Sequence, residues 1–325
     1  MNTSSATLDG RHLVVLAGGM SHEREVSVRS GRRVAEVLRA CGMEVSVRDL
    51  DAALLPYLET HRPDAVWPLL HGAGGEDGSL RDVLDALGLP YVGTGPGASR
   101  VAWSKTIAKG AVAAVGISTP DFVTLPQTLF RELGARAVLD RVVARLGLPL
   151  VVKPTHGGSA LGVTLVRRAE ELPRAMVECF AYGSVALIER AVVGTEIAVS
   201  VIDDGAGPSD AGPRALPAVE IVTDGSYDYD ARYNPGRTEY FSPARLDPAV
   251  AERAARVAVE AHRVLGLRHL SRTDMIVDDA GVPHFLEVNV APGMTETSLL
   301  PQAVRASDRT LADVYGGLVA AALSS

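Results

Sequence analysis

Cysteine is scarce in this sequence, and basic residues are in the minority. The 325 residues include two cysteines, Cys41 and Cys179, which lie far apart and without the spacing of a metal site. Such cysteines fit a reducing compartment and give no disulfide framework. Lysine and arginine number 32 against 39 aspartate and glutamate residues, a formal net charge of −7. We therefore do not expect a nucleic-acid-binding protein, which would carry a basic patch or stripe.

Long hydrophobic runs are also absent. No uninterrupted apolar stretch approaches the ~20 residues that a membrane-spanning helix needs. Residues 1–10 lack the charged and apolar regions of a signal peptide. Apolar residues nevertheless make up 47% of the chain, enough for buried cores. We expect a soluble, cytoplasmic protein without a membrane partner, built from two or three domains.

Two well-known nucleotide-binding loops are missing. The sequence has no Gly-x-x-x-x-Gly-Lys-[Ser/Thr] loop, and no Gly-x-Gly-x-x-Gly follows its first predicted strand. The second absence argues against a dinucleotide-dependent dehydrogenase. A different glycine-rich segment, residues 157–162, follows Lys153. Its backbone N–H groups could form an anion nest to which Lys153 adds charge; a plain flexible turn is the alternative.

The first part of the chain alternates strands with helices. Apolar runs at residues 12–17, 44–50 and 65–69 predict strands, with helical patterns after the first run and after the third. This alternation predicts a parallel α/β sheet, on which ligands collect at the carboxyl ends of strands. Two polar, glycine-rich loops, residues 18–25 and 71–78, follow strands at that edge.

A second pattern lies near the C-terminus. The apolar runs 275–277 and 282–288 flank an Asp-Asp-Ala-Gly loop, which predicts a β-hairpin. Folding this hairpin brings Asp274 near Glu287 and Asn289, which share one strand face. Two carboxylates and an amide oxygen suit a hard cation such as Mg²⁺. A hairpin with a solvated acidic face is the alternative.

Three further residues acquire candidate roles beside the hairpin. Arg272 lies two positions before Asp274 and could stabilise a developing oxyanion; a salt bridge to a nearby acid is the alternative. The backbone N–H of Gly293 could serve the same oxygen. The hydroxyl of Ser298 could bind a carboxylate.

Two lysines and two glutamates precede the hairpin. Lys105 and Lys153 lie on separate predicted elements, and each alone would be expected at the surface. Glu189 and Glu196 bracket the apolar segment 191–194, a pattern that could hold an adenosine.

Six motifs occur in a fixed order along nearly the whole chain. They are Gly-Gly-Met-Ser-His-Glu-Arg-Glu-Val-Ser (18–27), His-Gly-Ala-Gly-Gly-Glu-Asp-Gly (71–78), Val-Lys-Pro-Thr-His-Gly-Gly-Ser-Ala-Leu-Gly-Val (152–163), Tyr-Asp-Tyr-Asp-Ala-Arg-Tyr (227–233), Arg-Thr-Asp (272–274) and Glu-Val-Asn-Val-Ala-Pro-Gly-Met-Thr-Glu-Thr-Ser-Leu (287–299). Together they resemble the D-alanine–D-alanine ligases of the ATP-grasp superfamily. Any single motif would be weak, whereas six in this order are specific.

The resemblance implies an α/β, three-domain ATP-grasp fold. Residues 1–95 would form a parallel α/β substrate-binding domain, residues 96–190 a small central α+β domain, and residues 191–325 a C-terminal α+β domain with a mainly antiparallel sheet. The implied reaction joins two D-alanines through a D-alanyl phosphate and gives D-alanyl-D-alanine for peptidoglycan precursors. ATP and two Mg²⁺ ions would take part, Mn²⁺ could substitute, and the protein would be a cytoplasmic homodimer.

The resemblance also assigns roles to individual residues. The first substrate would be positioned by Glu23, Ser159 and Tyr233, and the tetrahedral oxyanion stabilised by Arg272 and Gly293. His71 would line the substrate pocket, and Ser298 with Leu299 would hold the second substrate's carboxylate. The phosphates of ATP would bind Lys105 and Lys153, the adenosine would bind Glu189, Arg190 and Glu196, and the metal ions would bind Asp274, Glu287 and Asn289.

Some positions depart from the family pattern. Ser104 stands where the family usually has Asp, Ala160 where a second Ser is usual, and Arg190 where many members have Lys. These departures leave room for a paralog in secondary metabolism that joins a different small amino or hydroxy acid. A non-catalytic binding protein on the same fold is a third hypothesis. Tyr233 favours an amine acceptor, because relatives that make D-alanyl-D-lactate often carry Phe there.

Overall fold

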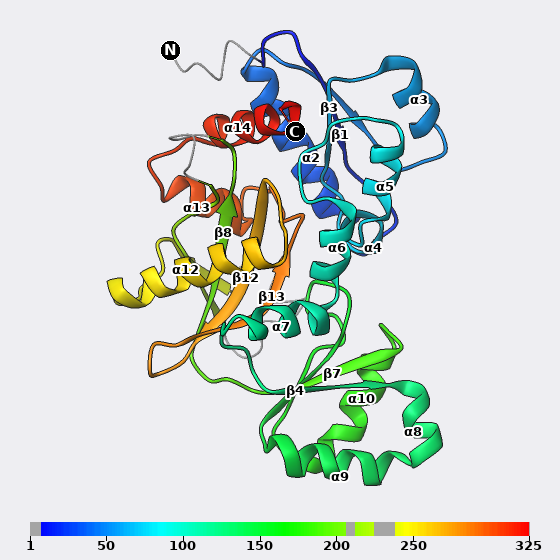
Figure 1. Ribbon diagram of the computed structural model, residues 1–325, viewed down its shortest axis with the longest axis vertical. Helices are drawn as coiled ribbons and strands as arrows, with labels where there is room; N and C mark the ends of the chain where they lie inside the picture. The colour runs from blue at the N-terminus through cyan, green and yellow to red at the C-terminus, as the bar shows by residue number, and fades with distance from the viewer. Residues whose placement is uncertain (1–7, 206–211, 224–237, 325) are drawn as a thin grey trace.

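The computed structural model describes residues 8–205, 212–223 and 238–324, and within them the chain forms three β-sheets (Figure 1). The first sheet is parallel, and the two that follow are antiparallel. Helices pack against each sheet. The predicted α/β class, with a parallel N-terminal part and an antiparallel C-terminal part, is confirmed.

The N-terminal sheet has the strand order β2-β1-β3. Successive side chains of a strand point to opposite faces. Leu13 and Val15 of β1 therefore contribute to one buried cluster, with residues of α2, whereas Val14 and Leu16 contribute to another, with residues of α3 and α5. Helices thus cover both faces, as a parallel sheet requires. The elements are β1 (His12–Leu16), α2 (Arg24–Ala40), β2 (Glu44–Arg48), α3 (Leu54–His61), β3 (Ala65–Pro68), α4 (Ala73–Glu76) and α5 (Ser79–Ala86).

The central sheet has the strand order β4-β7-β5-β6 and a core of its own. Leu150 and Ile188 of the strands pack with Leu146 and Cys179 of the helices. The elements are β4 (Phe122–Pro126), α8 (Gln127–Leu133), α9 (Ala135–Leu146), β5 (Leu150–Pro154), β6 (Thr164–Val166), η1 (Ala169–Glu171), α10 (Leu172–Phe180) and β7 (Val185–Arg190).

The C-terminal sheet has the order β11-β10-β8-β12-β13, and β9 pairs with β8. The long helix α12 packs on this sheet through the buried small residues Ala254 and Ala258, which allow a close approach. The elements are β8 (Thr195–Ile202), β9 (Arg214–Ala215), β10 (Val219–Thr223), β11 (Thr238–Phe241), α12 (Pro248–Val264), β12 (Leu270–Val277), β13 (Pro283–Asn289), α13 (Leu299–Arg305) and α14 (Leu311–Leu323).

Two helices that precede the central sheet pack against the C-terminal one. α6 (Pro96–Trp103) and α7 (Lys105–Ala114) contact β13, and Val112 of α7 shares a buried cluster with Phe285. The N-cap of α7 is Ser104, whose side chain accepts a hydrogen bond from the N–H of Ile107. The predicted domain limits stay predictions.

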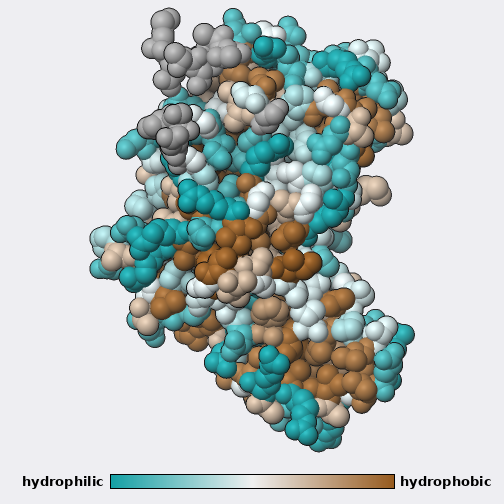
Figure 2. Space-filling view, in the orientation of Figure 1, coloured by the Kyte–Doolittle hydropathy of each residue, from teal (hydrophilic) through white to brown (hydrophobic). Residues whose placement is uncertain are grey.

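The C-terminal helix α14 ties the end of the chain to its beginning. Tyr315 and Leu318 lie in the same buried cluster as Leu13 of β1, and the Tyr315 ring meets the Trp67 ring edge-on with centroids 5.4 Å apart. The N-terminal and C-terminal parts therefore share a core. In Figure 1 they lie together above the block formed by the central sheet and its helices, and Figure 2 shows hydrophobic residues gathered on that lower block.

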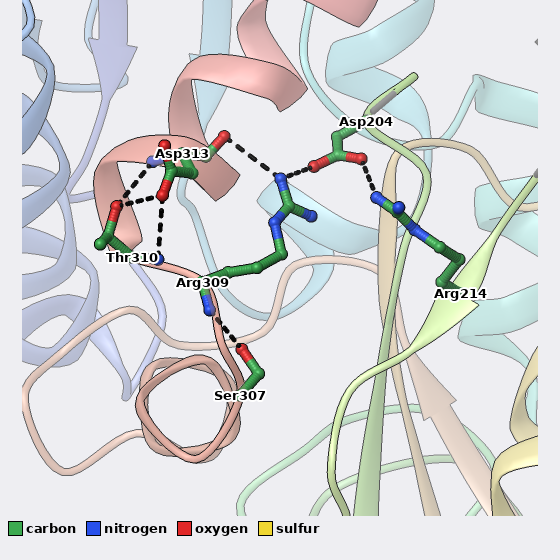
Figure 3. Close-up of polar contacts among 6 residues, drawn as sticks. All are labelled: Asp204, Arg214, Ser307, Arg309, Thr310 and Asp313. Carbon is green, nitrogen blue, oxygen red and sulfur yellow. Dashed lines mark hydrogen bonds and ion pairs between the residues drawn. The ribbon is translucent and has the colours of Figure 1, made fainter. Parts of the chain in front are cut away.

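A cluster of ion pairs around the buried Asp204 fixes the start of α14 (Figure 3). Asp204, which follows β8, lies 2.7 Å from Arg214 and 2.5 Å from Arg309. Thr310 and Asp313 form a capping box at the first turn of the helix. The segment after β8 is thereby held against the segment that enters α14.

Not every helix is as the sequence predicts. The sequence pattern of residues 127–146 predicts one helix, but the structure divides it into α8 and α9 at Gly134, whose φ of +81° ends the helical path. The sequence also predicts a strand that begins at Tyr91, where the structure has a single bridge to Val66. The sequence patterns do not predict α3, α10 and α13, which are at most nine residues long. None of the helices in the described residues has both the length and the apolar composition of a membrane span.

The docking of α14 is testable with a matched pair of leucines. Leu318 is fully buried, whereas Leu133 of α8 is 63% exposed. We expect Leu318→Ala to lower the free energy of unfolding by about 2–5 kcal/mol, because it removes buried methyl groups and leaves a cavity. Leu133→Ala should change it by about 0.5 kcal/mol or less. Urea denaturation followed by circular dichroism measures both, and equal losses would contradict the packing of α14.

Candidate active site

Two cavities meet at the β12–β13 hairpin. The larger, of about 570 Å³, is lined by elements of the central and C-terminal sheets. The smaller, of about 150 Å³, is lined by residues of the N-terminal part and of the segment after β13. Gly158, Asp274 and Glu287 line both. A group bound in one cavity would therefore lie beside a group bound in the other.

The predicted hairpin is present and sets the geometry of this junction. β12 and β13 pair antiparallel, with Asp274 opposite Glu287 and Arg272 opposite Asn289. The register shifts between Asp274 and Met275, and such an irregularity re-aims side chains at the end of a strand pair. The three predicted metal ligands thus lie together on one hairpin.

Each hairpin carboxylate has a cationic partner. The guanidinium of Arg272 donates two hydrogen bonds to Asp274, at 2.7 and 2.8 Å. The ammonium of Lys105 lies 3.0 Å from Glu287 Oε2. Lys105 also donates to the carbonyl of Gly157 at 2.5 Å, which connects α7 to the glycine-rich loop. Two ion pairs therefore lie where the two cavities meet.

The donor set of the hairpin fits Mg²⁺. Asp274, Glu287 and Asn289 supply only hard oxygen donors, and Mg²⁺ is usually bound by one or two carboxylates together with substrate phosphates. Asn289 Oδ1 also accepts a hydrogen bond from the N–H of Ala291 at 2.7 Å, which fixes the orientation of the amide. No group of three His, Cys, Asp or Glu residues in the described part of the chain could hold a metal alone. A cation at this hairpin would therefore need phosphate or water oxygens.

The glycine-rich loop reaches across to the N-terminal part. Ser159 and Ala160 both have positive φ, +54° and +56°, a conformation that non-glycine residues rarely adopt. The strain turns the Ser159 hydroxyl towards Glu23, and the two side chains form a short hydrogen bond. Two residues predicted to position the first substrate are therefore in direct contact. Tyr233, the third, lies outside the described residues.

Glu189, a predicted adenosine contact, lies between two lysines. It is 2% exposed, and its two carboxylate oxygens lie 2.5 Å from Lys153 Nζ and 2.7 Å from Lys109 Nζ. Arg190 and Glu196 line the larger cavity on either side of segment 191–194. The adenosine contacts stay predictions, and the position of Glu189 points to a role towards the two lysines.

The smaller cavity contains buried acid and base side chains. His71 is 6% exposed, and the pKa of its imidazole is lowered by burial, although the charge of Glu23 opposes this effect. Burial, with the charge of Glu23 nearby, raises the pKa of Glu76 to about 8. Glu76 also accepts a hydrogen bond from the N–H of Gly72 at 2.8 Å. It lies within motif 71–78, but its chemistry comes from burial, which the motif does not reveal.

The opposite wall is formed by the segment after β13. Ser298 Oγ accepts a hydrogen bond from the N–H of Thr295 at 3.0 Å, and a Cβ on Gly293 would lie 2.8 Å from that oxygen. Only glycine therefore fits at position 293 without a shift of Ser298. Gly293, Ser298 and Leu299, all predicted to act on the substrates, line the smaller cavity.

The raised pKa of Glu76 predicts a pH dependence of stability. The carboxyl group of Glu76 binds its proton more tightly in the folded protein than in the unfolded chain. The free energy of unfolding therefore falls as the pH rises from 4.5 to about 8, because the unfolded chain loses this proton first. We expect Glu76→Gln to gain stability relative to the natural protein as the pH rises through this range. Thermal unfolding between pH 5 and 9 measures the difference, and a difference independent of pH would contradict it.

Comparison with known proteins gives a consistent result. A family model described as the D-ala D-ala ligase C-terminus matches residues 111–319. The D-alanine–D-alanine ligase of Anaeromyxobacter dehalogenans is 39% identical over 298 residues, which cover 91% of this chain and 92% of that protein. The D-alanine–D-alanine ligase from Bacillus anthracis complexed with ATP has a TM-score of 0.80 and 28% identity, over 97% of this chain and 98% of that chain. The VanG D-Ala:D-Ser ligase from Enterococcus faecalis has a TM-score of 0.82 and 25% identity, over 97% and 100%.

These matches agree with the six motifs and with the ATP-grasp fold class. The family model covers more than half of the chain, and the relative from Anaeromyxobacter dehalogenans matches nearly all of it. The chain belongs to the D-alanine–D-alanine ligase family.

Proposed function

We propose that this protein is an ATP-dependent ligase that joins two D-alanines into D-alanyl-D-alanine, a peptidoglycan precursor. The observation that carries the proposal is that Asp274 and Glu287 line both the larger and the smaller cavity. In our assignment ATP occupies the larger cavity and the amino acids occupy the smaller one. The γ-phosphate then lies beside the carboxylate that it activates.

The first step is phosphoryl transfer. A carboxylate oxygen of the first D-alanine attacks the γ-phosphorus, the bond to the β-phosphate oxygen breaks, and ADP leaves with an acyl phosphate remaining. The ammonium groups of Lys105 and Lys153 offset the phosphate charge during transfer. Asp274, Glu287 and Asn289 would hold Mg²⁺, which when bound supplies further neutralisation of phosphate charge.

The second step is acyl transfer to an amine. The neutral amine of the second D-alanine attacks the acyl carbon and its nitrogen gives one proton to water, the bond to the phosphate oxygen breaks, and inorganic phosphate leaves. The carbonyl oxygen becomes negative in between, and the guanidinium of Arg272 with the N–H of Gly293 would stabilise it. Because Asp274 holds Arg272 by two hydrogen bonds, the cation needs little reorganisation during reaction.

The smaller cavity would orient both amino acids. Glu23 would receive the ammonium group of the first substrate. The hydroxyl of Ser159 donates a hydrogen bond to the Glu23 carboxylate and would fix its orientation. Tyr233 would help to position that substrate. His71 would line the pocket, while Ser298 and the backbone N–H of Leu299 would hold the carboxylate of the second substrate. A cavity of about 150 Å³ suits small amino acids.

We also propose a cytoplasmic location, where ATP is supplied, and a homodimer. Light scattering coupled to gel filtration would measure the mass of the particle in solution. A mass near 34.1 kDa, that of one chain, would exclude the dimer.

The substrate assignment is tested by a product assay. Purified protein with ATP, Mg²⁺ and D-alanine should release ADP, inorganic phosphate and D-alanyl-D-alanine in equal amounts, measured by coupled assay and mass spectrometry. D-serine, D-lactate and other small acids form the comparison panel. Turnover with one of them and none with D-alanine would replace this proposal by a ligase of different specificity, and ATP binding with no turnover on any substrate would indicate a binding protein.

A substitution at Glu287 tests the proposed metal site most directly. Glu287→Gln keeps the shape but removes the charge that would hold Mg²⁺ and that pairs with Lys105. We expect kcat to fall by roughly 10²-fold or more, since transition-state charge is no longer compensated. Glu252→Gln, on an exposed pair with Arg256, is the matched control and should keep full activity. Near-normal turnover of Glu287→Gln would refute the assignment of the metal site.

A further inference from the structure

A buried lysine lies behind the larger cavity. Lys109 of α7 has a fully buried side chain, and its Nζ lies 2.7 Å from Glu189 Oε2. Lys153 Nζ lies 2.5 Å from the other oxygen of the same carboxylate. Lys153 and Glu189 are among the residues that line the cavity, and Lys109 is not. Lys109 therefore acts on the cavity, if at all, through Glu189.

The charges of this group do not balance. One carboxylate faces two ammonium groups, so the three side chains carry one excess positive charge in a place with little solvent. The pKa of Lys109 is lowered to about 8, mainly by burial; the charge of Lys153 acts in the same direction, whereas Glu189 and Asp121 oppose the shift. A buried excess charge is unfavourable unless an ion of opposite sign pairs with it. The open side of the group faces the cavity, where a phosphate would supply that ion.

We propose that Lys109 is a positioning residue for the nucleotide phosphates. It neutralises Glu189, so that the positive charge of Lys153 remains available to a phosphate in the cavity. Without Lys109, Glu189 and Lys153 form a neutral pair, and the phosphate meets no net charge from them. This inference rests on the proposed function in one respect, that a nucleotide occupies the larger cavity.

A purely structural role for Lys109 makes a different prediction. The side chain also passes near the Phe122 ring, with Nζ 5.2 Å from the centroid, and its neighbours Ala108 and Val112 are buried. If Lys109 served only to pack α7 against the sheets, its loss would lower stability and would weaken every ligand of the cavity alike. The positioning role requires instead an effect that depends on the phosphates.

Lys109→Met is the first test. Titration calorimetry, without any amino acid present, would give the Kd of ATP, ADP and adenosine for the natural protein and the variant. We expect the Kd of ATP to rise by roughly 10- to 100-fold, the range for loss of a charge-assisted contact, and that of adenosine to change less than about twofold. A folded variant with unchanged ATP affinity, or with equal losses for ATP and adenosine, overturns the inference.

The double variant Lys109→Met/Glu189→Gln supplies a second, independent reading. It removes one positive and one negative charge, so Lys153 again carries the single excess charge of the natural group. Because Glu189 also lines the cavity, its loss can change adenosine binding by itself, so the quantity compared is the Kd of ATP divided by the Kd of adenosine. We expect this ratio to return to within about threefold of that of the natural protein. A ratio still raised tenfold or more overturns the inference, even if the single variant does not fold.

A remote control separates loss of charge from loss of stability. Arg309→Met removes a cation from the Asp204 cluster, which lines neither of the two cavities at the hairpin. It should lower the melting temperature and leave the Kd of ATP unchanged. If the natural protein binds ATP but does not ligate D-alanine, the substrate assignment fails and the role of Lys109 stands. If the natural protein binds no nucleotide at all, both fail.

Discussion

The register between β12 and β13 is the constraint on which the site depends. It places Asp274 opposite Glu287 and Arg272 opposite Asn289. A slip by one residue would turn each of these side chains to the other face of the sheet. The buried side chains of Met275 and Phe285 lie in the same two strands and are held in separate cores by α12 and by α6–α7. The packing of Met275 and Phe285 against these helices thus fixes the register, and the register fixes the positions of the polar side chains of the site.

The charges of the site are arranged so that their burial costs little free energy without a ligand and favours the binding of a polyanion. Asp274, Glu189 and Glu287 each have a cation within 3.0 Å, which offsets the cost of removing these carboxylates from water. Lys109 adds a further positive charge. A polyanion such as a triphosphate would neutralise this excess positive charge. The arrangement therefore favours the binding of a nucleotide.

The parts of the site that the sequence predicts are those encoded locally. The hairpin follows from two apolar runs and an Asp/Gly loop, and the glycine-rich loop follows from its composition. Lys109 and Glu76 escape sequence reasoning because their properties arise from burial by distant segments: Lys109 and Glu189 are 80 positions apart. The packing of α7 on β13 is likewise invisible in the sequence of either element. Local patterns specify elements, whereas pKa values and charge balance are set by the tertiary contacts between them.

The smaller cavity exists only because three parts of the chain meet. The Ser159–Glu23 hydrogen bond connects the central glycine-rich loop to the N-terminal part. The N–H of Met294 donates to Ser30 of α2 at 3.0 Å, which connects the segment after β13 to the same helix. The first contact joins Glu23 to a loop in which Ser159 has positive φ, while the second is buried within a shared core. The central loop and the segment after β13 are thus both held against the N-terminal part, and together they enclose the smaller cavity.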